Sequence, residues 1–125
     1  MTPLRHGLLA LVFSAAVSLS CSSPSVPRDV TLVARGMTFT LAGDAKLLNP
    51  VIAVRAGERI RLVLKNEAPG LLHDIEIAAW DVQVNQIGAG ETADVTFVVP
   101  NQPGRYEYRC RPHAEMMSGF IEVTP

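Results

Sequence analysis

The chain has 125 residues, which is enough for one domain with a single hydrophobic core. Its formal net charge is −1, and acidic and basic residues are interspersed, so there is no basic field that would suggest nucleic acid as a partner. Hydrophobic residues make up 48% of the sequence, a share typical of a globular protein that the N-terminal segment raises further.

Residues 1–20 are typical of a signal peptide. Arg5 and His6 form a short basic lead, and residues 8–19 form an apolar run that is too short for a membrane span. We therefore expect export to the periplasm or the outer surface of a bacterial cell.

Cys21 follows the apolar run directly, and residues 22–27 are rich in serine and proline. This order predicts a bacterial lipoprotein, with cleavage before Cys21, lipid on its sulfur and residues 21–27 as a flexible tether. Leu19 stands two positions before Cys21, whereas lipoproteins usually place it three before. Ordinary cleavage nearby, which would leave Cys21 as a free thiol, is the alternative. Two or more acyl chains would give a stable membrane anchor.

Residues 28–125 form the predicted folded domain, in which short β-strands alternate with turns. The clearest strand covers residues 59–65, where Ile60, Leu62 and Leu64 alternate with charged residues. Further strands are predicted at residues 30–34, 51–55, 73–78, 92–99, 104–110 and 119–123. Segment 41–50 fits no strand and is expected to be a loop that could hold one helical turn. The pattern predicts an all-β fold, a Greek-key β-sandwich of seven to eight strands.

The predicted strand at 104–110 ends on a cysteine that should face the core. Tyr106, Tyr108 and Cys110 share one face of this strand, because successive strand residues point to opposite faces. His113 then lies in the loop that follows, and Gly119 opens the last strand.

A second histidine lies on a different strand. His73 shares its face with Ile75 and Ile77, so its side chain should also point inward. Without residues 1–20, His73 and His113 are the only histidines of the chain. A thiolate, two imidazoles and a weak thioether are the ligands of a blue-copper electron-transfer site. Singly, each residue would be ordinary core material, but together they predict a copper site.

The run Cys110-x-Pro112-His113, followed by methionine and then Gly119, resembles the ligand loop of the small cupredoxins, such as plastocyanin, pseudoazurin and amicyanin. His73 matches the upstream histidine of their pattern. The resemblance covers roughly residues 28–124. It implies a Greek-key β-sandwich that holds one type 1 copper ion and transfers single electrons.

Two methionines compete for the axial position. The family's Met-x-Gly pattern fits Met117-Ser118-Gly119, whereas a short spacing like that of amicyanin would select Met116. We predict Met117 as the axial ligand. Met116 is the alternative, and the methionine that does not bind would pack beside the site or lie on the surface.

The sequence also predicts two tuning residues. Many family members have asparagine after the first histidine, but this chain has Asp74, whose carboxylate can accept hydrogen bonds from backbone N–H groups near Cys110. Alternatively, Asp74 turns to solvent and pairs with Arg109 or Arg111. An ionised carboxylate there favours Cu(II) and lowers the reduction potential. Pro112 has no N–H to donate to the Cys110 sulfur, which again favours Cu(II).

We expect redox proteins to dock where the edge of His113 reaches the surface. The surrounding apolar rim consists of Pro69, Gly70, Leu71, Leu72, Pro112 and Ala114. Weak electron-transfer complexes use small interfaces of this kind. Leu71 and Leu72 could instead anchor the loop internally. We expect a monomer whose only membrane contact is through the lipid.

Catalysis by this chain alone is not expected. Copper oxidases and nitrite reductases need further histidines for a second copper centre, and a binuclear copper site needs two cysteines in one loop. The better alternative to an electron shuttle is a copper carrier or buffer that uses the same ligands.

Overall fold

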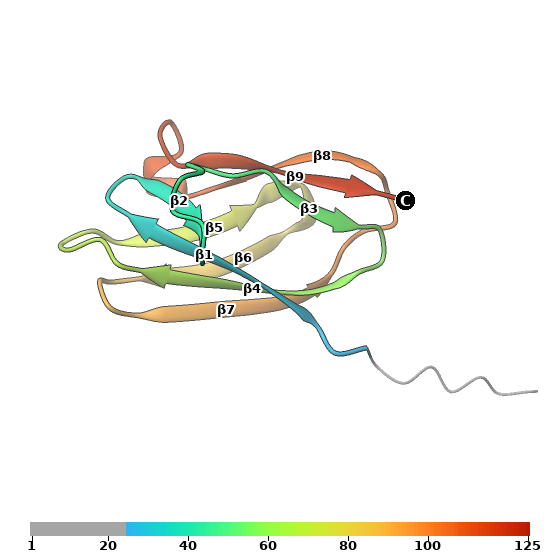
Figure 1. Ribbon diagram of the computed structural model, residues 1–125, viewed down its shortest axis with the longest axis horizontal. Coiled ribbons are helices and arrows are strands. Elements are labelled where there is room, and N and C mark those ends of the chain that lie inside the picture. Colours follow the sequence, from blue (N-terminus) through green and yellow to red (C-terminus); the bar gives the residue numbers. More distant parts are fainter. Residues whose placement is uncertain (1–24) are drawn as a thin grey trace, which may run out of the picture.

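The structure, a computed structural model, describes residues 25–125, which form a two-layered β-sandwich (Figure 1). The predicted signal peptide and Cys21 lie outside the described residues. Within residues 25–125, no helix has the length and hydropathy needed to cross a membrane.

Nine strands of the described chain form two sheets that face each other across the core. The first sheet has the order β2-β1-β4-β7 and the second the order β3-β9-β8-β5-β6. The first comprises β1 (Arg28–Arg35), β2 (Thr38–Leu41), β4 (Arg59–Asn66) and β7 (Thr92–Val98). The second comprises β3 (Ile52–Arg55), β5 (His73–Ile77), β6 (Val82–Ile87), β8 (Gly104–Arg109) and β9 (Ser118–Thr124). Two short 3₁₀ turns are η1 (Ala78–Trp80) and η2 (Arg111–His113).

Alternation along the strands places one apolar row of each sheet in the core. In β4, Ile60, Leu62 and Leu64 are buried, while Arg59 and Lys65 are exposed. Burial of such rows is the main favourable term in folding. The predicted all-β sandwich is therefore confirmed, with nine strands in place of seven to eight.

Two strands were not predicted. β2 has only four residues, and the loop that follows it contains turns and bends but no helix. β6 lies at the edge of its sheet, and Val84 is its only buried residue. Because an edge strand buries little, the sequence of β6 (VQVNQI) carries only a weak alternation.

The strand register defines two ends of the sandwich. β1 runs parallel to β4, so that Arg28 pairs with Ile60 at one end and Ala34 with Asn66 at the other. Asn66 is buried, and its Nδ2 donates to the carbonyls of Leu71 at 2.8 Å and Ile87 at 3.0 Å. These bonds fix the loop that leads into His73. The chain therefore enters the fold at the end opposite His73.

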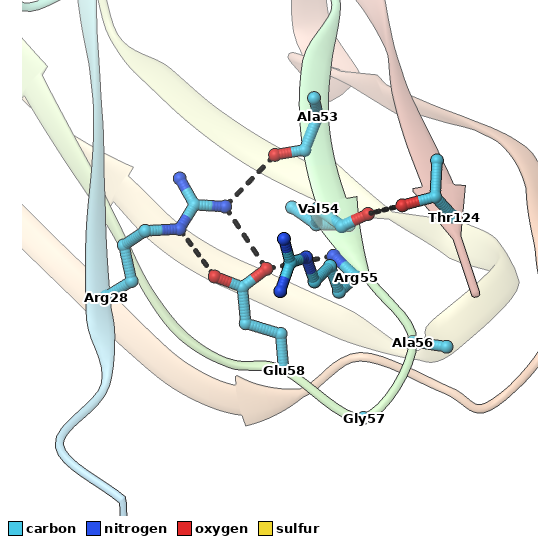
Figure 2. A pocket seen from close by; sticks show the side chains of 8 residues that line it. All are labelled: Arg28, Ala53, Val54, Arg55, Ala56, Gly57, Glu58 and Thr124. Carbon is cyan, nitrogen blue, oxygen red and sulfur yellow. Dashed lines mark hydrogen bonds and ion pairs between the residues drawn. The ribbon is translucent and has the colours of Figure 1, made fainter.

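Side chains cover the free edge of β3, which is the outer strand of the second sheet (Figure 2). Arg28 Nη2 donates to the Ala53 carbonyl at 3.0 Å, and the Arg55 N–H donates to Glu58 Oε2 at 2.9 Å. Arg28 Nε and Glu58 Oε1 are 2.5 Å apart, so an ion pair joins the two side chains that bind the β3 backbone. Unpaired backbone groups at a sheet edge invite pairing with another chain. The Arg28–Glu58 pair therefore shields this edge.

Replacing Glu58 with alanine is expected to promote self-association, because the Arg55 N–H loses its acceptor and Arg28 loses its anchor. Sedimentation velocity over a concentration series measures the effect. Glu67→Ala is the matched control, since it breaks the Arg35–Glu67 surface pair without uncovering β3. Equal association of both variants would contradict the shielding role.

A close contact between β8 and β9 holds the base of the loop that joins them. Tyr108 is buried, lies directly opposite Gly119 and donates a hydrogen bond to the Pro50 carbonyl at 2.7 Å. A Cβ atom at Gly119 would overlap the Tyr108 ring. Position 119 must therefore be glycine because the ring lies across its backbone.

Gly119→Ala is expected to lower the free energy of unfolding by about 1–3 kcal/mol, as overpacking of a core does. Urea denaturation measures the loss. Adding Tyr108→Leu should recover part of it, because the smaller side chain removes the overlap. Fully additive losses in the double variant would show that the two residues do not interact.

Candidate metal centre

The sandwich brings the three predicted strong ligands together at one end. His73 is the first residue of β5, and Cys110 follows the last residue of β8. These strands are antiparallel neighbours, with Glu76 opposite Arg109, so the start of one meets the end of the other. His113 ends η2, three residues after Cys110. The three donor atoms lie within 4.8 Å of one another.

The donor spacing fits a single metal ion. Cys110 Sγ is 3.6 Å from Nδ1 of His73 and 3.6 Å from Nδ1 of His113. Metal bonds of about 2.0 Å to nitrogen and about 2.3 Å to sulfur place such donors about 3.5 Å apart around one ion. The two rings meet nearly edge to face, with centroids 5.0 Å apart. Both imidazoles therefore present the same nitrogen to a common point.

Backbone hydrogen bonds close the loop that carries the ligands. The Cys110 N–H donates to the Met117 carbonyl at 2.9 Å, which continues the β8–β9 ladder. The His113 N–H donates to the Cys110 carbonyl at 3.1 Å, and the Met117 N–H donates to the His113 carbonyl at 2.9 Å. Cys110, His113 and Met117 are thus held relative to one another by the main chain.

The two methionines of this loop have different surroundings. Met117 is completely buried in the core, whereas Met116 is 54% exposed. Asn49 Nδ2 donates to the Met116 carbonyl at 2.8 Å and ties the loop to the segment after β2. Only Met117 combines a buried thioether with a position next to the ligand cluster in sequence.

Asp74 is buried and links the two ligand segments. Its Oδ1 accepts the Arg111 backbone N–H at 2.8 Å, and its Oδ2 accepts Arg111 Nε at 2.8 Å. The carboxylate thus binds the backbone next to Cys110, as the first alternative predicted, and pairs with Arg111, as the second predicted. The expected turn toward solvent is wrong, because Asp74 is buried. Its negative charge is balanced by a guanidinium that is itself partly exposed.

Burial sets the protonation of the ligands in the absence of metal. It lowers the pKa of His73 below its usual range, so this imidazole is neutral near pH 7 and available as a ligand. Burial also raises the pKa of the Cys110 thiol. Because copper binds the thiolate, loading the site releases a proton.

The predicted rim residues are all accessible to solvent to some degree. Leu72 is 54% exposed, Pro112 is exposed, and Leu71 and Ala114 are half-buried. His113 is also half-buried, while His73 is fully buried. Of the three ligand residues His73, Cys110 and His113, only His113 is therefore accessible from the surface.

The family model described as "Copper binding proteins, plastocyanin/azurin family" matches residues 42–124. This range is more than half of the chain and contains all the predicted ligands. The chain therefore belongs to this family of cupredoxins. No curated protein sequence matches it.

Solved structures support the same fold. Auracyanin A, a "blue" copper protein from the green thermophilic photosynthetic bacterium Chloroflexus aurantiacus, matches with a TM-score of 0.62 and 20% identity, covering 79% of this chain and 100% of that one. Reduced auracyanin from the photosynthetic bacterium Roseiflexus castenholzii matches with a TM-score of 0.61 and 19% identity. The match covers 78% of this chain and 97% of that chain. McoA multicopper oxidase from Aquifex aeolicus matches with a TM-score of 0.63 and 17% identity, covering 85% of this chain but only 30% of that chain.

The family and the ligand cluster together define the cofactor as one type 1 copper ion. His73, Cys110 and His113 would hold it. When bound, copper supplies a one-electron couple between Cu(I) and Cu(II). The protein would supply the same three donor groups, one thiolate and two imidazoles, to both Cu(I) and Cu(II).

Sequence reasoning missed two residues that position the site. Asn66 fixes the approach to His73, and Asn49 holds the Met116 backbone. Asparagines near loops usually serve in turns, and neither one carries a sequence signal that names its distant partner.

Asp74→Asn is expected to raise the reduction potential of the copper-loaded protein, because a negative charge that favours Cu(II) is removed. The asparagine oxygen can still accept the Arg111 N–H, so the loop should keep its geometry. Voltammetry measures the shift. Glu76→Gln is the control: its carboxylate is more exposed than that of Asp74, so screening should make its shift smaller. An unchanged or lowered potential in Asp74→Asn would contradict the charge argument.

Proposed function

We propose that this protein shuttles single electrons between redox partners outside the cytoplasm, through one type 1 copper ion. The proposal is carried by one observation: the donor atoms of His73, Cys110 and His113 converge on one point. Met117 follows His113 by four residues in the chain and is buried. In this assignment Met117 is the weak axial ligand and Met116 is a surface residue.

The main-chain bonds of the ligand loop suit this activity. Electron transfer is fast when little has to move between the two oxidation states. Cys110 and His113 are joined by a 3.1 Å hydrogen bond, and Cys110 and Met117 by one of 2.9 Å. A loop fixed in this way keeps its donors in place whichever oxidation state the ion has.

Electrons would cross through His113 at a small apolar surface. Leu72 precedes the ligand His73 directly and is 54% exposed, and Pro112 precedes His113 and is exposed. Apolar contacts of limited area support the brief complexes that electron carriers form. We therefore propose that redox proteins dock at this surface. The protein would act as a monomer and would catalyse no reaction of its own.

We also propose that the protein is exported and anchored by lipid on Cys21. The described chain enters β1 at Arg28, at the end of the sandwich opposite His73. A tether at this end leaves the copper end free to meet partners. A copper carrier or buffer with the same ligands remains the alternative function.

Adding Cu(II) to the purified soluble domain should produce intense red-region absorption and a reversible one-electron voltammogram. Cys110→Ser should abolish the colour. Met117→Leu should change the spectrum and raise the potential, because a weak donor is lost, whereas Met116→Leu should alter neither. Rapid loss of copper to a chelator, without reversible cycling, would favour the carrier instead.

Leu72→Glu should slow electron self-exchange between reduced and oxidised protein by at least about tenfold, because like charges meet at the docking surface. NMR line broadening in mixtures of both forms measures the rate without a known partner. Added salt should restore part of it. Val98→Glu is the control, since Val98 is 61% exposed and pairs with Arg59 at the other end of the sandwich. Equal slowing in both variants would refute docking at Leu72.

A further inference from the structure

A surface cleft adjoins the copper centre on the outer side of His113. Its volume is about 430 Å³, and residues of the ligand loop form most of its wall. The lining residues are Met37, Arg111, Pro112, His113, Ala114, Glu115 and Met116. Met37, Met116 and the metal ligand His113 therefore line one cleft, although Met37 is far from the others in sequence.

The two methionines reach this cleft from different elements, and backbone hydrogen bonds fix the position of Met116. Met37 lies in the turn between β1 and β2 and packs against the core. The Met116 N–H donates to the His113 carbonyl at 3.0 Å, while its own carbonyl accepts Asn49. A fixed backbone keeps the exposed Met116 side chain at the rim instead of in the core.

Met116 is 54% exposed, and Met37 is partly buried against the core, so both side chains are accessible to solvent at least in part. Thioethers are soft ligands that select Cu(I) over the harder divalent ions. We propose that Met37 and Met116 form an outer docking site for Cu(I), from which the ion passes to the copper centre. This inference rests on the centre itself and not on the electron-shuttle role.

His113 connects the two sites. It lines the cleft, and its Nδ1 is 3.6 Å from Cys110 Sγ. The two sites therefore share the His113 residue, and an ion held by the methionines would lie next to a ligand residue of the final site. The ion stays Cu(I) throughout. The sulfur–copper bonds to the methionines would break, bonds to Cys110, His73 and His113 would form, and the thiol proton would leave to solvent.

The charges around the cleft do not oppose a cation. The Arg111 guanidinium is paired with Asp74 at 2.8 Å, so its positive charge is balanced. Glu115 also lines the cleft, is exposed, and forms no ion pair within residues 25–125. Its carboxylate adds negative charge to the wall of the cleft.

The first test adds a second equivalent of Cu(I) to the reduced, copper-loaded protein under anaerobic conditions. The methyl NMR signals of Met37 and Met116 should shift together, with a common saturation curve. Met117 is an internal control, because it is buried and its surroundings are already complete. Unshifted Met37 and Met116 signals would overturn the proposal.

The second test measures how fast the metal-free protein takes up Cu(I) from a weak chelator. Met37→Leu with Met116→Leu should slow loading several-fold, while the final blue colour after oxidation and the reduction potential stay unchanged. Leucine keeps the apolar volume, so folding should be preserved. Val98→Thr is the control for an exposed apolar residue away from the cleft.

The outcomes separate this proposal from the proposed function. Unchanged loading rates in the double variant overturn the docking site, even if the protein cycles electrons normally. Slowed loading with normal colour supports it, even if the protein proves to be a carrier. An equal effect of Val98→Thr would assign the slowing to general surface changes and overturn the role of sulfur.

Discussion

The hydrogen bond from the Cys110 N–H to the Met117 carbonyl, at 2.9 Å, is the constraint on which the copper end depends. It is one more rung of the β8–β9 ladder, so the two ends of the ligand loop are fixed by the sheet itself. The loop between them has room only for η2 and a tight turn, which directs His113 back toward Cys110. Below this rung, the Tyr108 ring over Gly119 prevents the strands from shifting.

The strand order of this same sheet also places the remaining ligand, His73. β5 lies beside β8, and this places His73 at the same end as Cys110. Asp74 then joins the two strands through Arg111, with one bond to the backbone and one to the side chain. The residue that follows the first ligand thus sets both the geometry and the charge of the site.

The copper ligands could be predicted from the sequence because their residue types are scarce. After residue 20 the chain has two histidines, and Cys110 lies three residues before one of them. Strand alternation placed β4 well, since its charged and apolar residues alternate sharply. It failed for β6, where Val84 alone is buried, and for the four residues of β2. Hydrogen bonds from asparagine to distant carbonyls, as at Asn66, depend on loop paths that alternation does not encode.

The position of Arg28 has a consequence for any segment attached before it. The eight residues of β1 span about 25 Å, and they separate the point where the chain enters from the copper end. Any segment attached before Arg28 therefore emerges about one strand length away from the copper end. Such a segment can be lengthened or changed without touching the ligands, because none of them lies at that end of the sandwich.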